Sequence, residues 1–246
     1  MPKRFVVPAS DFSELPRFPG DIELPEALTV AARHLHDTDT PHSTMRVAVR
    51  LAVRLLPGAE HAGISEIDRD GLRRTVARTD DVVRVADGPD SAGHGQPPYW
   101  EGLWHAPVVR VADSELEAGG EALAAAGVRS ALALRLRAEK RRLTVLTAYS
   151  AKPRAFDEEA TRIGRLFTAH VSLALDSATV REQLTEAMRT RDLIGQATGI
   201  LMERLDIDAA EAFDSLVRAS QRENVKLRDL ARRIVDAKNA TGRPGS

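Results

Sequence analysis

Residues 157–205, DEEATRIGRLFTAHVSLALDSATVREQLTEAMRTRDLIGQATGILMERL, decide how this chain is organised. The stretch begins with Asp157, a good N-cap residue, and two glutamates follow where a helix dipole favours negative charge. No proline interrupts it. Apolar residues recur at helical spacing, so the sequence predicts a long helix that joins the first part of the chain to the last.

The same stretch carries a heptad pattern of mixed quality. With Ile163 at position a, the other a positions are occupied by His170, Ser177, Leu184, Arg191 and Thr198, of which only Leu184 is strongly apolar. We expect a parallel two-chain coiled coil over 173–190; the alternative is one helix packing its apolar stripe on its own sheet. The d positions are all apolar: Leu166, Leu173, Val180, Ala187, Ile194 and Leu201. The predicted dimerisation residues are Leu173, Val180, Leu184 and Ala187.

The residues before the long helix predict a mixed region of helices and strands. Amphipathic stretches at 24–35 and 45–55, separated by Pro41, predict two helices. The sequences DRDG at 68–71 and EKR at 139–141 are typical of turns between strands. The expected strands are 61–67, 72–78, 108–111, 129–137 and 143–149, with a further helix near 115–126.

Residues 87–107, DGPDSAGHGQPPYWEGLWHAP, predict a long loop that is functional or mobile. Both tryptophans of the chain, Trp100 and Trp104, fall in it beside Tyr99. Such rings line a small-molecule pocket in some proteins and cover a sheet edge in others. These three are therefore the candidate ligand-binding residues, with structural cover as the alternative.

The last part of the chain predicts a small helical unit. Residues 189–205 provide its first helix, and Asp208 with Glu211 forms a capping-box-like start to the second. Leu227, Leu230 and Ile234 give a third apolar stripe. The N-terminal residues 1–21 are expected to be a mobile arm, and residues 239–246 a disordered tail.

Composition and motifs argue against several classes of protein. The chain has no cysteine, which excludes disulfides and thiolate metal sites and favours a reducing cytoplasm. No apolar run is long enough to span a membrane. Common nucleotide-binding, hydrolase and zinc-protease motifs are absent, and Asp80-Asp81 is interpreted as a turn or helix start rather than a catalytic pair. We therefore expect no enzyme activity, no cofactor and no metal site.

Residues 190–235 resemble an ANTAR domain, the antitermination module named after amidase and nitrate-assimilation regulators. The resemblance rests on the sequences IGQA at 194–197 and GILM at 199–202, on AF at 212–213, and on LRD at 227–229, which fall in family order. It implies a dimer that binds RNA hairpins. Thr198 stands where the family commonly has lysine, so this position brings no charge to RNA.

Residues 25–180 resemble a GAF sensory domain. The resemblance is carried by GVRS at 127–130, before a strand, and by AFD at 155–157, before the long helix. The Asn-Lys-Phe-Asp-Glu signature of cyclic-nucleotide-binding GAF domains is absent. Together the two resemblances imply an α+β fold: a GAF-like antiparallel sheet flanked by helices, a long coiled-coil helix and a three-helix ANTAR module. The expected boundaries are 22–172 for the sensor, 173–190 for the connecting helix and 191–238 for the RNA-binding domain.

The charge of the last part of the chain requires clustered cations if it binds RNA. Residues 189–246 hold eleven Lys and Arg against nine Asp and Glu, a net charge of only +2. Cations are expected to contact phosphates, and amides and hydroxyls to contact unstacked bases. The candidate RNA-binding residues are Gln196, Thr198, Arg204, Arg218, Ser220, Gln221, Asn224, Lys226 and Arg228.

Two functions follow from the sequence. The first is a signal-responsive RNA-binding antitermination regulator that binds hairpin loops in nascent RNA as a homodimer, its signal a small molecule or a protein. The second is a helix-turn-helix DNA-binding or protein-interaction regulator with the same sensor. The helix at 227–238 favours the second, because a recognition helix needs basic side chains. It carries Arg228, Arg232, Arg233 and Lys238.

Overall fold

The computed structural model describes residues 23–87, 99–117 and 119–241 of the chain. The chain forms two compact units, which meet between Val180 and Arg181. The helix α6, Glu158–Leu205, is continuous and contributes to both units. The predicted arm at 1–21, most of the predicted tail and residues 88–98 of the predicted loop lie outside the described residues.

The first unit contains a five-stranded antiparallel sheet in the order β2-β1-β5-β4-β3, so the predicted antiparallel α+β fold is confirmed. Each predicted strand is present to within one residue at either end. The strands are β1 His61–Asp68, β2 Arg73–Arg78, β3 Val108–Val111, β4 Ser130–Ala138 and β5 Arg142–Ser150.

Both predicted hairpin turns are present. Gly71 has a positive φ of 78°, which glycine adopts without strain, and its N–H donates to the Asp68 carbonyl at 2.9 Å. The N–H of Glu139 donates to the Arg142 carbonyl at 2.8 Å. These local bonds join β1 to β2 and β4 to β5, and therefore set the register of the two hairpins.

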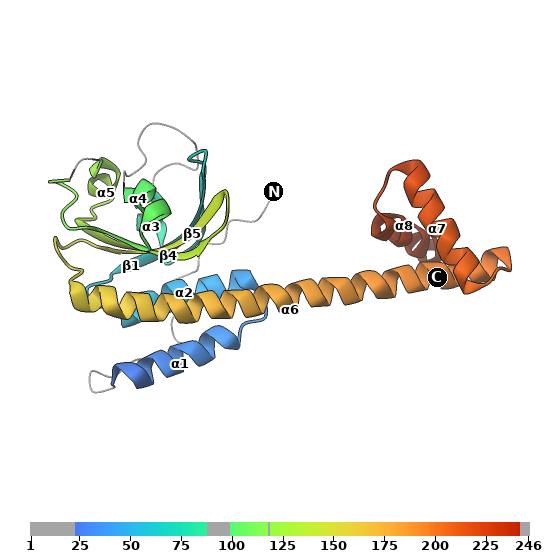
Figure 1. Ribbon diagram of the computed structural model, residues 1–246, viewed down its shortest axis with the longest axis horizontal. Coiled ribbons are helices and arrows are strands. Elements are labelled where there is room, and N and C mark those ends of the chain that lie inside the picture. Colours follow the sequence, from blue (N-terminus) through green and yellow to red (C-terminus); the bar gives the residue numbers. More distant parts are fainter. Residues whose placement is uncertain (1–22, 88–98, 118, 242–246) are drawn as a thin grey trace, which may run out of the picture. The chain divides into compact units, whose positions relative to one another are not determined.

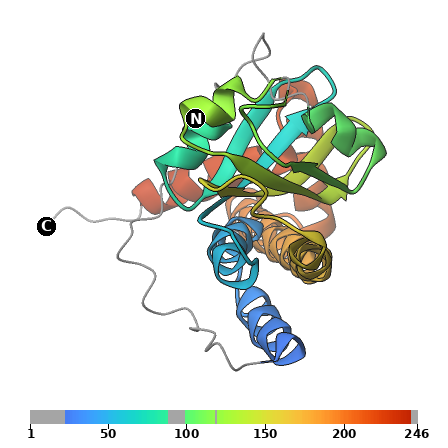
Figure 2. The same ribbon diagram turned by 90° about the vertical axis from the view of Figure 1, so that its left-hand side faces the viewer.

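One face of the sheet is covered by α2, Pro41–Leu55, and by the first part of α6, and α1, Leu24–His36, packs against α2 on the side away from the sheet (Figures 1 and 2). Pro41 is the first residue of α2, where its missing N–H costs nothing, and Thr40 caps the helix in a reciprocal bond with Ser43. Leu51, Leu146 and Phe167 are fully buried between the helices and the sheet.

α6 approaches the sheet closely at Gly164. A Cβ atom at this position would lie 2.7 Å from Cδ1 of Leu134, which is itself buried. Glycine weakens a helix interior by roughly 1 kcal/mol relative to alanine. Here it gives α6 room to lie against β4.

Three short helices lie on the opposite face of the sheet: α3 Asp81–Ala86, α4 Tyr99–His105 and α5 Glu121–Ala125 (Figure 1). Asp80 caps α3 by accepting the N–H of Val82 at 2.9 Å, which confirms the predicted helix start. Residues 99–105 are helical, so the prediction of one continuous loop over 87–107 is wrong there. Burial of Trp100 and Leu103, three residues apart, stabilises this turn of helix on the sheet.

α5 is much shorter than the helix predicted near 115–126. A Cβ atom on Gly120 would lie 1.9 Å from the carbonyl oxygen of Ser114. The backbone therefore folds back on itself between these residues, in a contact that only glycine permits. That fold prevents a helix from starting at 115, and α5 begins at Glu121.

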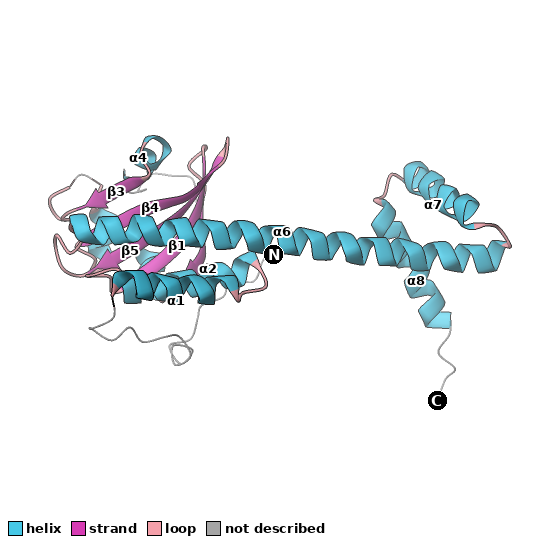
Figure 3. Cartoon of the chain, turned by 60° about the horizontal axis from the view of Figure 1, so that its bottom comes forward, coloured by secondary structure: helices cyan, strands magenta, loops and turns pink. Residues whose placement is uncertain are grey.

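The second unit consists of the last part of α6 with α7, Ala209–Glu223, and α8, Leu227–Thr241 (Figure 3). Asp208 caps α7, as predicted, by accepting the N–H of Glu211 at 2.9 Å. The core of the unit is made by Ala197, Leu216, Leu230 and Ala231. Because α8 reaches Thr241, residues 239–241 are helical, and the prediction of a tail beginning at 239 is wrong for them.

The close contact between the turn after α2 and Ala155 in the first unit can be tested by substitution. Gly58 has a φ of +83°, and a Cβ there would lie 2.6 Å from the Ala155 carbonyl oxygen; Gly127 has a φ of +73° with open space around it. Gly127→Ala should cost the first unit about 1–2 kcal/mol of unfolding free energy for the strained φ alone. Gly58→Ala should cost at least about 1 kcal/mol more. Urea unfolding followed by the fluorescence of Trp100 and Trp104 measures both, and equal losses would contradict the contact.

Candidate nucleic-acid interface and sensor core

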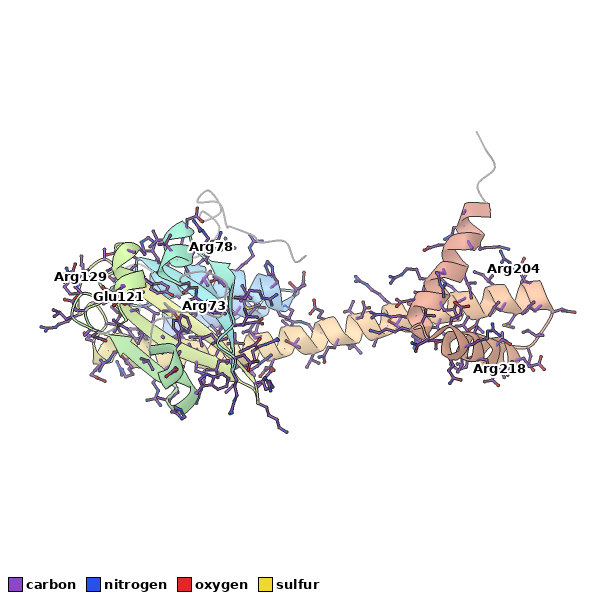
Figure 4. All side chains as sticks on the ribbon, turned by 90° about the horizontal axis from the view of Figure 1, so that it is seen from above. Arg73, Arg78, Glu121, Arg129, Arg204 and Arg218 are labelled. Atoms are coloured by element: carbon purple, nitrogen blue, oxygen red, sulfur yellow. The ribbon has the colours of Figure 1, made fainter. Side chains whose placement is uncertain are left out.

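The side chains predicted to bind RNA are distributed over all three helices of the second unit. Ion pairs within the unit separate them into two groups. Arg228 lies 3.4 Å from the Glu186 carboxylate and 3.5 Å from that of Asp229, so its charge is neutralised locally. Among the described residues, the other basic candidates have no carboxylate within 4 Å. They are Arg204, Arg218 and Lys226, and the same holds for Arg222 on α7 (Figure 4 labels Arg204 and Arg218).

The outer face of α7 brings several of these groups together. Leu216 is buried on the inner side of the helix, and Arg218 and Arg222, four residues apart, lie on exposed positions. Arg218 donates to the Ser215 hydroxyl at 3.0 Å. Gln221 is also exposed on this helix. The surface therefore combines two cations and an amide within two helical turns.

The α7–α8 turn uses two of the predicted residues for its own structure. The Ser220 hydroxyl donates to the Val225 carbonyl at 2.7 Å, so its proton is not available to a base. Asn224 adopts the left-handed conformation, φ 53°, that ends α7. Its side chain is exposed, as is that of Lys226, the next cation along the chain.

Gln196 and Thr198 do not share a face with each other. Residues two apart on a helix point about 200° apart, and Ala197 between them is buried in the three-helix core. The Thr198 hydroxyl donates to the Ile194 carbonyl at 2.9 Å. The two side chains therefore lie on different faces of α6.

α6 has two apolar faces. One is buried in the core of the first unit through Phe167, Val171, Ala174 and Leu175. The other, which follows the predicted d positions and Leu184, is exposed. The exposed fractions of Leu166, Leu173, Val180, Leu184 and Met188 are 46%, 58%, 62%, 61% and 52%, and Ala187 is exposed too. The stripe predicted to dimerise is thus exposed to solvent.

The side of the sheet that carries α3 and α4 holds a buried polar cluster that sequence reasoning missed. The Asp87 carboxylate accepts the hydroxyls of Ser65 at 2.8 Å, Thr75 at 2.5 Å and Tyr149. Arg73 lies 3.7 Å from the same carboxylate, and both side chains are almost completely buried. In the sequence, Arg73 is followed by an exposed arginine and reads as a solvated strand residue, so no signal marked it.

Trp100 belongs to this side of the sheet. It is 3% exposed, and the Arg73 guanidinium lies 5.2 Å from its ring centroid. Trp104 is half-buried with Arg69 over its ring at 5.3 Å, while the side chain of Tyr99 lies outside the described part. Trp100 also packs with Leu103, a position that favours the interpretation of structural cover.

Comparison with known protein families identifies both units. Residues 38–176 match the GAF domain family, which is more than half of the chain, and residues 182–235 match the ANTAR domain family. The chain belongs to the GAF family. Its first unit is a GAF domain, a sensor domain, and its second an ANTAR domain, an RNA-binding antitermination module. No curated protein matches the chain.

Solved structures similar to this protein include photoreceptors. The bacteriophytochrome RpBphP3 from R. palustris has a TM-score of 0.57 with 14% identity, over 82% of this chain and 48% of that one. The Stigmatella aurantiaca phytochrome photosensory core module has a TM-score of 0.57 with 13% identity, over 78% and 43%. A phycoerythrobilin-bound GAF domain from a cyanobacterial phytochrome has a TM-score of 0.52 with 14% identity, over 65% and 97%. The chain thus spans about half the length of the first two, and at these identities the likeness shows the fold alone.

The GAF motif at 127–130 has a structural role. Arg129 donates to both Asp113 carboxylate oxygens, at 2.9 and 2.7 Å, and the Ser114 hydroxyl donates to the Val128 carbonyl. The Arg129 hydrogen bonds hold the pKa of Asp113 below its ordinary value of 3.8. Because the pKa is lowered in the folded protein, the Asp113–Arg129 pair stabilises the fold fully at pH values above 3.8. This stabilisation is lost as the pH falls through the pKa of the folded state.

The buried cluster predicts that substituting Asp87 costs the GAF domain much more unfolding free energy than substituting the exposed Asp81. Asp87→Asn removes the charge opposite buried Arg73 and should cost about 3–5 kcal/mol of unfolding free energy. Asp81→Asn removes a 68% exposed carboxylate, 3.4 Å from Arg78, and should cost under about 1 kcal/mol. Tyr149→Phe should cost about 1.5–3 kcal/mol. Urea unfolding monitored by tryptophan fluorescence measures all three, and similar losses for the two aspartates would contradict the role of the cluster.

Proposed function

We propose that this protein is a signal-responsive transcription antitermination regulator that binds hairpin loops in nascent RNA as a homodimer. The observation that carries the proposal is the set of cations on the ANTAR domain that have no ion pair among the described residues. Because the domain has little net charge, such a local cluster is what RNA binding requires. Arg218 and Arg222 on α7 and Lys226 after it contact phosphates.

Base recognition falls to the exposed amides in the same region. Gln221 and Asn224 present donors and acceptors to the edges of unstacked loop bases. Ser220 supports them indirectly, because its bond to the Val225 carbonyl fixes the turn. Arg204, at the exposed end of α6, supplies a further phosphate contact. Gln196, Thr198 and Arg228 are weaker candidates, given their separation on α6 and the Glu186 ion pair.

The ion pairs also weigh against the helix-turn-helix alternative. Of the four cations on α8, Arg228 is paired with Glu186, Arg233 with Glu223 at 2.6 Å, and Lys238 with Glu203 at 3.0 Å. Among the described residues, Arg232 alone of the four has no carboxylate partner. A recognition helix needs cations that are free to enter a DNA groove, so α7 and the turn after it are the better nucleic-acid surface.

Homodimerisation follows the exposed stripe of α6. Leu173, Val180, Leu184 and Ala187 recur at heptad spacing, and burying them against the same stripe of a second chain removes this apolar surface from water. The connecting helix, 173–190, joins the sensor, 22–172, to the RNA-binding domain, 191–238, without a break in α6. A shift of the sensor therefore reaches the RNA-binding domain through a rigid element.

The signal acts on the sensor through the side of the sheet that carries Tyr99, Trp100 and Trp104. A small molecule or a protein partner that displaces α4 would alter the surroundings of both tryptophans. The protein acts in the cytoplasm, on nascent transcripts, without enzymatic activity of its own. Among the described residues no helix is long and apolar enough to cross a membrane.

The proposed RNA surface predicts that two arginine substitutions, each of which removes one positive charge, differ in their effect on RNA affinity and its salt dependence. Arg222→Ala should weaken binding to RNA hairpins and lower the salt slope of log K by about 0.7–0.9, because one phosphate contact is lost. Arg233→Ala, whose guanidinium is already paired with Glu223, should leave the slope nearly unchanged. Fluorescence anisotropy with a hairpin recovered by crosslinking to the protein measures both slopes. Equal changes would indicate long-range attraction without contact, and the absence of any crosslinked RNA would refute the proposed function.

The coiled coil predicts a matched pair of effects on dimerisation. Leu184→Glu places like charges across the two-chain seam and should convert the dimer to monomer. Thr185→Glu puts the same charge at the next exposed position, b, which faces solvent in a two-chain coil, and should leave the dimer intact. Light scattering at several concentrations distinguishes them. A monomeric unmutated protein would remove the coiled coil.

A further inference from the structure

An open groove of about 890 Å³ lies in the ANTAR domain, between the first turns of its α6 segment and α7. α7 contributes Phe213, whose side chain is 42% exposed although it is among the largest apolar groups of the domain. α6 contributes Ala187, Thr190 and Ile194. A large apolar ring left open to solvent beside such a groove points to an occupant.

The groove continues the exposed stripe of α6. Ala187 and Ile194 occupy the d positions that follow Leu173 and Val180 at intervals of seven residues. A second helix that follows this stripe past Val180 therefore arrives in the groove. The occupant indicated by this continuity is the same segment of a second copy of the chain.

We propose that the groove receives residues 180–194 of a second copy, so that Phe213 packs on the partner helix and the dimer interface extends into the ANTAR domain. This proposal rests on the homodimer of the proposed function and adds a specific part of its interface. In a parallel dimer the arrangement is symmetric, since each Phe213 packs on the other chain.

The quality of the heptads explains why the dimer needs this contact. Between residues 170 and 191 the a positions are His170, Ser177, Leu184 and Arg191, so Leu184 is the one strongly apolar residue among them. A stable coiled coil needs apolar a and d positions over about three to four heptads. Ala187, at d, is also small. The Phe213 ring adds apolar surface at the point where the stripe itself is weak.

Charge argues against RNA as the occupant. The carboxylate of Glu182 lines the groove and would repel phosphates. The other charged groups of the lining have partners, since Glu186 pairs with Arg228 and Arg191 lies 3.7 Å from Asp192. Arg218 and Arg222, the cations of α7 without ion pairs, are exposed and do not line the groove. A base stacked on Phe213 is the competing outcome of the test.

The first test measures dimerisation of the full chain without RNA. Phe213→Ala should raise the dimer dissociation constant at least tenfold in sedimentation equilibrium, whereas Phe213→Leu, which keeps an apolar side chain, should restore part of the affinity. Leu72→Ala, at a 47% exposed leucine of the GAF domain, is the matched control and should change nothing. A Phe213→Ala dimer as tight as the unmutated one would overturn the proposal.

The second test uses the absence of cysteine from the chain. Ala187→Cys introduces a sole thiol in the groove, and mild oxidation should link two chains, because d positions of a parallel coil approach closely enough for a disulfide. Gln221→Cys, on an exposed position of α7, should stay largely monomeric on denaturing gels. Equal crosslinking of the two variants, or none by Ala187→Cys, would contradict the groove as an interface.

The outcomes separate this proposal from the proposed function. An unmutated protein that is monomeric defeats the dimer and the groove together. If Phe213→Ala leaves the dimer unchanged but weakens hairpin binding, Phe213 belongs to the RNA-binding surface. In that case the proposed interface in the groove is wrong, while the proposed function stands. If Phe213→Ala weakens the dimer and the protein binds no RNA, the groove is supported as part of the dimer interface and the proposed RNA-binding function is wrong.

Discussion

The packing of α6 on the antiparallel sheet is the interaction on which the rest of this structure depends. Phe167, Val171 and Ala174 bury one face of the helix, and Gly164 lets it lie against Leu134. Because this face is used, the stripe through Leu173 and Val180 faces solvent. A single continuous helix is thus anchored in the GAF domain and provides the first helix of the ANTAR domain.

Local ion pairing determines which charges of the ANTAR domain can act outside it. The carboxylates of Glu186, Glu203 and Glu223 neutralise cations of α8, and none of these pairs holds Arg218 or Arg222. A count of basic residues gives all these side chains equal weight. Among the described residues, Arg218 and Arg222 of α7 thus stay without a carboxylate within 4 Å, in a domain that has little net charge.

Sequence periodicity predicted the strands, the long helix and the three-helix unit, because each of these buries one regular face. The failures have local causes. The contact between Gly120 and Ser114 shortened a helix that looked continuous, and burial of Trp100 formed a turn of helix in an apparent loop. The Arg73–Asp87 pair was not predicted, because Arg73 lies in β2 and Asp87 at the end of α3, and only the folded sheet and helix bring them together. On the ANTAR domain, sequence named the cations but could not say which were paired, since Arg228 meets Glu186 only in the folded unit.

The surroundings of the heptad stripe change along α6. An α-helix drifts about 20° per heptad relative to a strict seven-residue repeat. From Leu166 to Ile194 that drift is about 80°, so the d positions do not stay on one straight line along the helix. Ile194 and Leu201, both d positions, accordingly pack against the three-helix core. The d positions are therefore exposed as far as Ala187 and partly buried within the ANTAR domain from Ile194 onward, close to the exposed ring of Phe213.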